Sequence, residues 1–149
     1  MQKVIDIHNY LPHREPMLMV DLITQINRES VATTFLLKED NIFIENGRMC
    51  EAGLIENAAQ TCSAIVARKY FVDDDDRDIP NADVIGFISS IKSVKIHALP
   101  LVGCEIITKA SLISRFDTGD FITCMMSCST YCNDELLLEG EINLFIQER

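Results

Sequence analysis

The sequence predicts an α+β domain in which one long antiparallel sheet curls around a single buried helix. Two observations carry this prediction. Between residues 53 and 70, apolar side chains recur at helical spacing. After residue 84, long runs rich in Ile, Val, Thr and Phe alternate with short turn signals. The expected order is two strands, one helix and about four strands, which fits a single domain over residues 1–149.

Two strand candidates precede the helix, at residues 17–26 and 30–37, and the polar run Asn27-Arg28-Glu29 joins them. The helix candidate carries apolar side chains over more of its surface than the single stripe of a half-exposed helix. It is therefore expected to be largely buried, and its small residues allow a sheet to approach closely. Its apolar residues are Leu54, Ile55, Ala58, Ala59, Cys62, Ile65 and Val66.

The acidic residues 73–76 after the helix indicate a solvated loop, because a calcium loop needs alternating acidic residues around a central Gly. The strands that follow end at Ala98-Leu99-Pro100, Asp117-Thr118-Gly119 and Asn133-Asp134, which are typical of turns. Over residues 122–132, mostly apolar side chains alternate with polar ones, as in a strand with one buried face. Strands of about 12 residues, or roughly 40 Å, twist and curl, and the helix is expected to fill the concave side.

The charge balance excludes several classes of protein. The 149 residues include 13 Lys and Arg against 23 Asp and Glu, which gives a net charge of −10. Such an acidic chain does not fit a non-specific nucleic-acid binder or a protein that docks on anionic lipid. No run approaches the ~18 apolar residues of a membrane span, and the start lacks an apolar stretch of signal-peptide length. We expect a soluble cytoplasmic protein.

The six cysteines raise the question of disulfides or a metal site. They form no Cys-x-x-Cys pair and the three histidines stand alone, so the sequence predicts no metal site. Cys124, Cys128 and Cys132 share the parity of the apolar residues in their strand. We therefore expect these three to be small hydrophobic residues that face the core.

Three segments carry a resemblance to a known family. They are residues 11–21 (Leu-Pro-His-Arg-Glu-Pro-Met-Leu-Met-Val-Asp), the helical run Glu56-Asn57-Ala58-Ala59-Gln60, and residues 86–95 with the later Pro100-Leu101-Val102-Gly103. In this order they resemble the opening, the central-helix Glu-x-x-Ala-Gln and the third strand of the β-hydroxyacyl-acyl-carrier-protein dehydratases. That family has the hotdog fold, a long curved antiparallel sheet wrapped around one helix, in agreement with the periodicity.

The resemblance implies an enzyme that removes water from a 3-hydroxyacyl thioester held on an acyl carrier protein, without a cofactor. The reaction needs a base for the C2 proton, an acid for the departing hydroxyl and donors at the thioester oxygen. In the family, a loop histidine and the helix carboxylate supply the acid and base from different subunits. The resemblance thus also implies a homodimer, or a trimer of dimers, that acts in fatty acid or polyene biosynthesis.

Glu56 matches the family's helix carboxylate by its spacing to Gln60. The alternative is a Glu that only complements the helix dipole, but its apolar neighbours predict burial, which is costly unless the group is paired or used. Gln60 would orient the site, the alternative being a surface Glu–Gln pair. Gly53 is the candidate amide donor to the thioester, and Phe87 is a candidate residue of the acyl tunnel.

One departure from the family concerns the catalytic histidine. The usual Gly-His-Phe-Pro-Gly is absent, because residues 42–50 contain no histidine. A divergent branch, associated with aryl-polyene-type pigment synthesis, is similar in this loss, and the sequence resembles it. His13 is then the best substitute base, with an ordinary pKa near ~6.5. The alternative is a structural histidine that pins the N-terminal segment, and His8 and His97 are weaker candidates.

Three functions remain open at this level. The first is a dehydratase, the second a thioesterase in which Glu56 activates water, and the third a non-catalytic acyl-binding subunit that pairs with an active partner. His13 within about 6 Å of Glu56 across the dimer, with room for one water, would favour the enzyme, whereas a tunnel beside Glu56 with no histidine in reach would favour the acyl-binding subunit. An acidic carrier protein would need a basic patch, for which Arg68 with Lys69 or Lys92 with Lys95 are candidates, ordinary solvated surface being the alternative.

Overall fold

The computed structural model describes residues 7–71 and 84–148. The acidic run at residues 73–76 lies outside this part of the chain. The elements, in chain order, are the 3-10 helix η1 (Ile7–Asn9), the strands β1 (Leu22–Ile26), β2 (Ser30–Leu36), β3 (Ile44–Glu45) and β4 (Arg48–Met49), the helix α1 (Glu51–Phe71), and the strands β5 (Val84–Ile96), β6 (Glu105–Asp117), β7 (Ile122–Cys132) and β8 (Glu135–Glu148).

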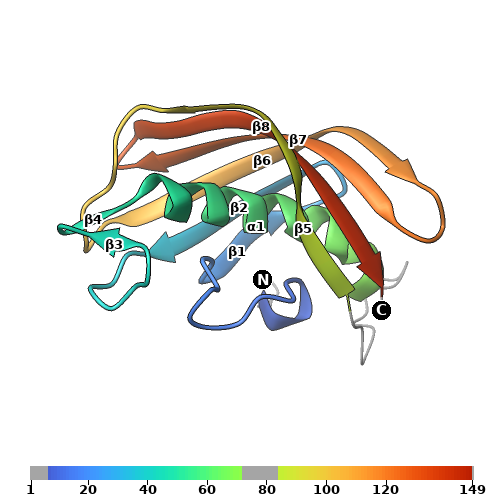
Figure 1. Ribbon diagram of the computed structural model, residues 1–149, viewed down its shortest axis with the longest axis horizontal. Coiled ribbons are helices and arrows are strands. Elements are labelled where there is room, and N and C mark those ends of the chain that lie inside the picture. Colours follow the sequence, from blue (N-terminus) through green and yellow to red (C-terminus); the bar gives the residue numbers. More distant parts are fainter. Residues whose placement is uncertain (1–6, 72–83, 149) are drawn as a thin grey trace.

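The six long strands form one antiparallel sheet in the order β1-β2-β6-β7-β8-β5. The sheet curves around α1, which contacts five of its strands (Figure 1). Strand β5 pairs with β8 on one side only, so it forms one edge of the sheet, and β1 forms the other. The predicted α+β architecture, with a long sheet around one helix, is confirmed.

The core lies between α1 and the inner face of the sheet. On β7 the side chains alternate between buried and partly buried from Ile122 to Thr130, which confirms the predicted period of two. The helix is buried as predicted, and its buried face also includes polar side chains. These polar residues are Asn57, Gln60, Thr61 and Ser63.

The first strand begins five residues later than the sequence predicts, because the backbone before it bonds to side chains of the helix. The Met19 N–H donates to Gln60 Oε1 (2.7 Å), and the Met19 carbonyl accepts from Asn57 Nδ2 (2.7 Å). These bonds satisfy groups that would otherwise need a neighbouring strand. The ladder with β2 begins at Leu22, next to the Asp21 N–H, which donates to the Thr34 carbonyl (2.9 Å).

A small hairpin of β3 and β4 was absent from the sequence-based expectation. Asn46 and Gly47 form its turn with φ values of 54° and 78°. An Asn-Gly pair favours this left-handed backbone, because Gly has no Cβ and Asn tolerates the region. The dipeptide is the signal that could have predicted the hairpin.

Two of the three β7 cysteines face the core as predicted. Cys124 and Cys128 are buried, and burial raises the pKa of Cys124 to about 11, so this thiol stays protonated at neutral pH. Cys132 is only partly buried against the core, and it forms a disulfide with Cys104 that the sequence did not predict, across a Cα–Cα distance of 6.7 Å. Cys104 precedes β6 and Cys132 ends the adjacent β7, so pairing of the strands brings together residues 28 apart in sequence.

Candidate active site

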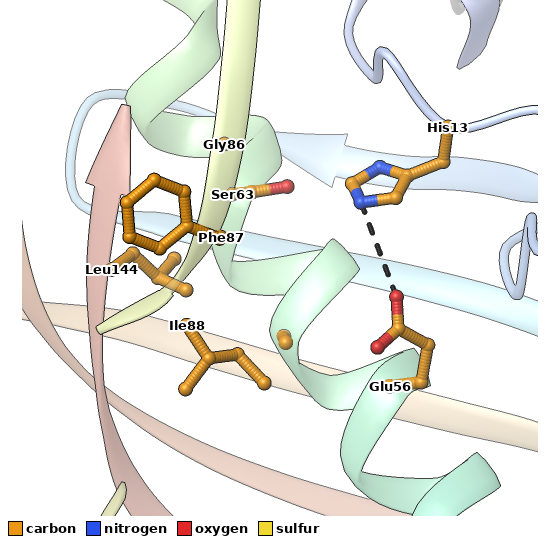
Figure 2. Close-up of a pocket in the computed structure, with 8 residues that line it drawn as sticks. His13, Glu56, Ser63, Gly86, Phe87, Ile88 and Leu144 are labelled. Atoms are coloured by element: carbon orange, nitrogen blue, oxygen red, sulfur yellow. Dashed lines mark ion pairs between the residues drawn. The ribbon is translucent and has the colours of Figure 1, made fainter. Parts of the chain in front are cut away.

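A pocket of about 180 Å³ lies between α1, the loop before β1 and the inner side of β5 and β8 (Figure 2). It contains one imidazole and one carboxylate, and the rest of its wall is mostly apolar or small. Its lining residues are His13, Glu56, Ala59, Ser63, Gly86, Phe87, Ile88 and Leu144. Concave, largely apolar sites with a few polar groups are typical of small-molecule binding.

His13 and Glu56 face each other across this pocket within one chain. His13 Nε2 lies 4.0 Å from Glu56 Oε1, and the two side chains are 21% and 25% exposed. This separation is longer than a hydrogen bond, so the two groups are neighbours that do not bond to each other directly. The resemblance implies a histidine and a carboxylate from different subunits, whereas His13 and Glu56 lie side by side within one chain.

The surroundings of His13 favour its neutral form. Burial lowers the pKa of His13 below its ordinary value, the carboxylate of Glu56 opposes this effect, and the cation of Arg14 lowers the pKa further. Among the residues that the structure describes, His13 Nδ1 is a buried atom with no hydrogen-bond partner. A neutral imidazole keeps one ring nitrogen free to accept a proton at neutral pH.

The loop that carries His13 is held by the neighbouring Arg14. Its Nη1 donates to the carbonyls of Leu11 (2.8 Å) and His13 (2.8 Å), and its Nη2 donates to the carbonyl of His8 (3.3 Å). A guanidinium presents its donors in a rigid fork, so one side chain can hold three carbonyls. The sequence alone did not indicate this role for Arg14.

Gln60 connects Glu56 to the same loop. Its Nε2 donates to Glu56 Oε1 (2.9 Å) and to the Met17 carbonyl (2.8 Å), while its Oε1 accepts from the Met19 N–H (2.7 Å). The side chain is 1% exposed and both amide hydrogens are used. Gln60 is therefore a buried brace, that is, a side chain that bonds both the Glu56 carboxylate and the backbone of the loop. It is not the exposed Glu–Gln pair that was the alternative.

The structure does not bring Gly53 into the pocket. Its N–H already donates to the Cys50 carbonyl (3.1 Å). A Cβ at this position would lie 2.6 Å from Phe43 Cβ and 2.7 Å from Met49 Cγ, so Gly53 allows close packing at the start of α1. That contact, and not a free amide, accounts for glycine here.

Phe87 borders the pocket, but its ring turns away from His13 (Figure 2). The ring stacks on Phe145 with centroids 4.9 Å apart. Phe145 alternates with the buried Leu144 and Ile146 on β8, so these rings lie on the outer face of the sheet. The inner wall at this point comes instead from Gly86 and Ile88.

Several pocket residues were missed although the sequence held a signal for them. Ala59 and Ser63 lie three and seven positions after Glu56, the spacing that places side chains on one helix face. Gly86 and Ile88 alternate along β5, and Ile88 pairs with Leu144 of β8. These spacings, applied from Glu56 and from the third family segment, would have identified the wall.

His8, His97 and Lys92 do not line this pocket. His97 contacts Glu139 (3.2 Å), and His8 lies 3.8 Å from Glu15. Lys92 pairs with Glu141 (3.4 Å), so its charge is balanced locally. The side chains of the candidates at positions 68 and 69 lie outside what the structure describes.

Family comparison identifies the group to which this site belongs. A model of ApeP-like proteins, described as ApeP dehydratase, matches residues 5–148. The chain belongs to the ApeP-like family. This confirms the resemblance to the aryl-polyene-type branch, and the chain is a 3-hydroxyacyl dehydratase-like protein. No curated protein matches the chain.

Solved structures similar to this ApeP-like chain agree on the fold. The dehydratase heterocomplex ApeI:P from Xenorhabdus doucetiae has a chain with 18% identity and a TM-score of 0.78, over 99% of this chain and 93% of that one. An uncharacterised protein from Pyrococcus horikoshii has 15% identity and a TM-score of 0.63, over 99% of this chain and 97% of that one. A hypothetical thioesterase with coenzyme A from Streptococcus pneumoniae has 12% identity and a TM-score of 0.58, over 85% of each chain. These similarities show the hotdog fold.

Residues 7–71 and 84–148 contain neither a membrane-spanning helix nor a cluster of metal-binding side chains. No helix there has the length and apolar composition to cross a membrane. In the same residues, no three His, Cys, Asp or Glu side chains are grouped as a metal site.

Proposed function

We propose that this protein removes water from a 3-hydroxyacyl thioester carried on an acyl carrier protein, with His13 and Glu56 as its acid and base. The observation that carries the proposal is their 4.0 Å separation in a pocket of an ApeP-like chain. This spacing places two proton-transfer groups beside one another, where a single substrate carbon and its neighbouring hydroxyl can reach both.

The chemistry follows from the states of the two groups. Neutral His13 accepts the C2 proton of the substrate, and the electron pair of the C–H bond moves toward the thioester. The imidazolium that forms faces the carboxylate of Glu56, which favours its charge. The pair then delivers a proton to the 3-hydroxyl as the C3–O bond breaks, so that water and a 2-enoyl thioester leave. His13 is neutral again, and atoms and charge balance.

We place the subunit contact at the free edge of β5. This edge borders the pocket, because Gly86, Phe87 and Ile88 all line it. The apolar Ile85, Phe87 and Ile91 are 39%, 51% and 44% exposed on the same strand. Unpaired strand edges with exposed apolar side chains favour pairing with another chain. A second copy would give the homodimer, in a cytoplasmic fatty acid or polyene pathway.

The reverse reaction provides the test. Purified protein is mixed with a 2-enoyl thioester, and hydration is followed by the loss of absorbance of the conjugated double bond. We expect hydration by the wild type, and a rate about 10²–10⁴-fold lower for His13→Ala and Glu56→Gln. Folding of each variant is checked by urea unfolding. Hydration by wild type and both variants at equal rates would reject the assignment.

The same assay separates the two alternatives. Release of free thiol without hydration would indicate a thioesterase. Absence of both reactions would favour the acyl-binding subunit, for which the heterocomplex of the Xenorhabdus doucetiae protein gives a precedent. Activity should then return only after a second hotdog subunit is added.

A further inference from the structure

A continuous chain of buried hydrogen bonds runs from the sheet to the Met19 backbone through Asn57. Thr130 Oγ1 on β7 lies 2.9 Å from Thr108 Oγ1 on β6, and Thr108 Oγ1 donates to Asn57 Oδ1 (2.6 Å). Asn57 Nδ2 then donates to the Met19 carbonyl (2.7 Å). All three side chains are at most 1% exposed.

The direction of each bond in this chain is fixed. A carbonyl can only accept, so the Met19 carbonyl requires the Nδ2 of Asn57, and its Oδ1 is left to accept. Thr108 has one hydroxyl hydrogen, which goes to that Oδ1, so Thr130 donates to Thr108. The Asn57 side chain therefore has one orientation, anchored to two strands of the sheet.

The anchored end of Asn57 acts on the loop that carries His13. Met19 is fully buried, and its two backbone groups are held by two amides of α1, the carbonyl by Asn57 and the N–H by Gln60. Both amides follow Glu56 on the helix: Asn57 is the next residue, and Gln60 lies one turn later. The loop and the carboxylate are thus tied to the same two helical turns.

We infer that Asn57 is a positioning residue that sets the place of His13 relative to Glu56, although it does not line the pocket. This inference rests on the proposed function for its catalytic consequence. Its structural content, the placement of His13, is independent of turnover. A shift of about 1 Å between acid and base groups can lower a rate 10²-fold, so the tie is expected to matter for kcat.

Two variants that differ only at position 57 test the inference. The control, Thr108→Val with Thr130→Val, removes the sheet end of the chain and keeps the bond from Asn57 to Met19. The test variant adds Asn57→Leu, which has a similar volume and releases the Met19 carbonyl. Neither variant leaves a buried hydroxyl of Thr108 or Thr130 unpaired. The control leaves Asn57 Oδ1 without its donor, and the test variant leaves the Met19 carbonyl without its donor, so each has one unpaired acceptor.

The first readout is the titration of His13, followed by NMR of its ring protons. The charged groups that face His13 are Glu56 of α1 and Arg14 of its own loop, and neither variant changes them. Burial is the largest cause of the lowered pKa, so release of the loop should move the pKa of His13 up toward its ordinary value. The control keeps the bond from Asn57 to the Met19 carbonyl, so the pKa of His13 should stay closer to the wild-type value in the control than in the test variant.

The second readout is catalysis. We expect kcat of the test variant to fall about 10–100-fold relative to the control, with KM changed by less than about 3-fold. Equal kcat and equal His13 titration in the two variants would overturn the inference and leave Asn57 a structural residue. A shifted titration in a protein whose wild type shows no turnover would support the positioning of His13 and reject the dehydratase assignment.

Discussion

Replacing Gln60 with Leu removes the buried brace that joins Glu56 to the loop. The Met19 N–H loses its acceptor in a fully buried position, which costs about 1–3 kcal/mol. The Met17 carbonyl also loses a donor, but Met17 is 42% exposed and water can reach this part of the chain, so we count about 0.5–1.5 kcal/mol. Gln60→Leu should therefore lower the free energy of unfolding by about 1.5–4.5 kcal/mol.

The assay is equilibrium unfolding in urea, with the free energy extrapolated linearly to zero denaturant. A matched control is Gln25→Leu, the same substitution at an exposed position of β1, which should change the free energy by no more than about 0.5 kcal/mol. Equal effects of the two substitutions would refute the reasoning, because the hydrogen bonds of Gln60 would then contribute nothing measurable.

Three further predictions follow from the site. Arg14→Met removes a cation that lowers the pKa of His13, so the acid limb of kcat/KM should move to higher pH; an unmoved limb would contradict this. Because the pKa of His13 is lowered in the folded state, the unfolded chain binds more protons than the folded one as the pH falls below about 6.5. His13 should therefore lower the free energy of unfolding by at most about 1.4 kcal/mol for each unit by which the pH falls. In His13→Gln the slope should be smaller by this contribution, and urea unfolding of both proteins over a range of pH checks it. Gly53→Ala should cost about 1–3 kcal/mol of stability in urea unfolding, and a neutral result would show that Phe43 and Met49 yield freely.

The sequence predicted the long strands and the helix because each carries a repeated local signal. The alternation over β7 and the apolar spacing of α1 are read directly from the residue order. The loop before β1 could not be predicted in this way, because residues 17–20 form an apolar run like that of a strand. Only the tertiary structure shows that side-chain amides of α1, and not a neighbouring strand, bond to their backbone.

In the candidate site too, the sequence identified some residues correctly and could not place others. Glu56 and His13 were found through family segments, and the structure brings them together in one pocket. Gly53 was assigned by its place shortly before Glu56 and Phe87 by its place in the third segment, without knowledge of where their atoms point. Gly53 packs closely against Phe43, and the ring of Phe87 stacks on Phe145 at the outer face of the sheet.

The measurement that tests the central claim most directly is water loss in the forward direction. A purified carrier protein loaded with a 3-hydroxyacyl chain is incubated with wild type, His13→Ala, Glu56→Gln and the double variant, and intact mass reports the loss of one water. We predict turnover by wild type, rates about 10²–10⁴-fold lower in each single variant, and a double variant no slower than the slower single one, since the two groups act as a unit. Wild-type rates in either single variant would contradict the account.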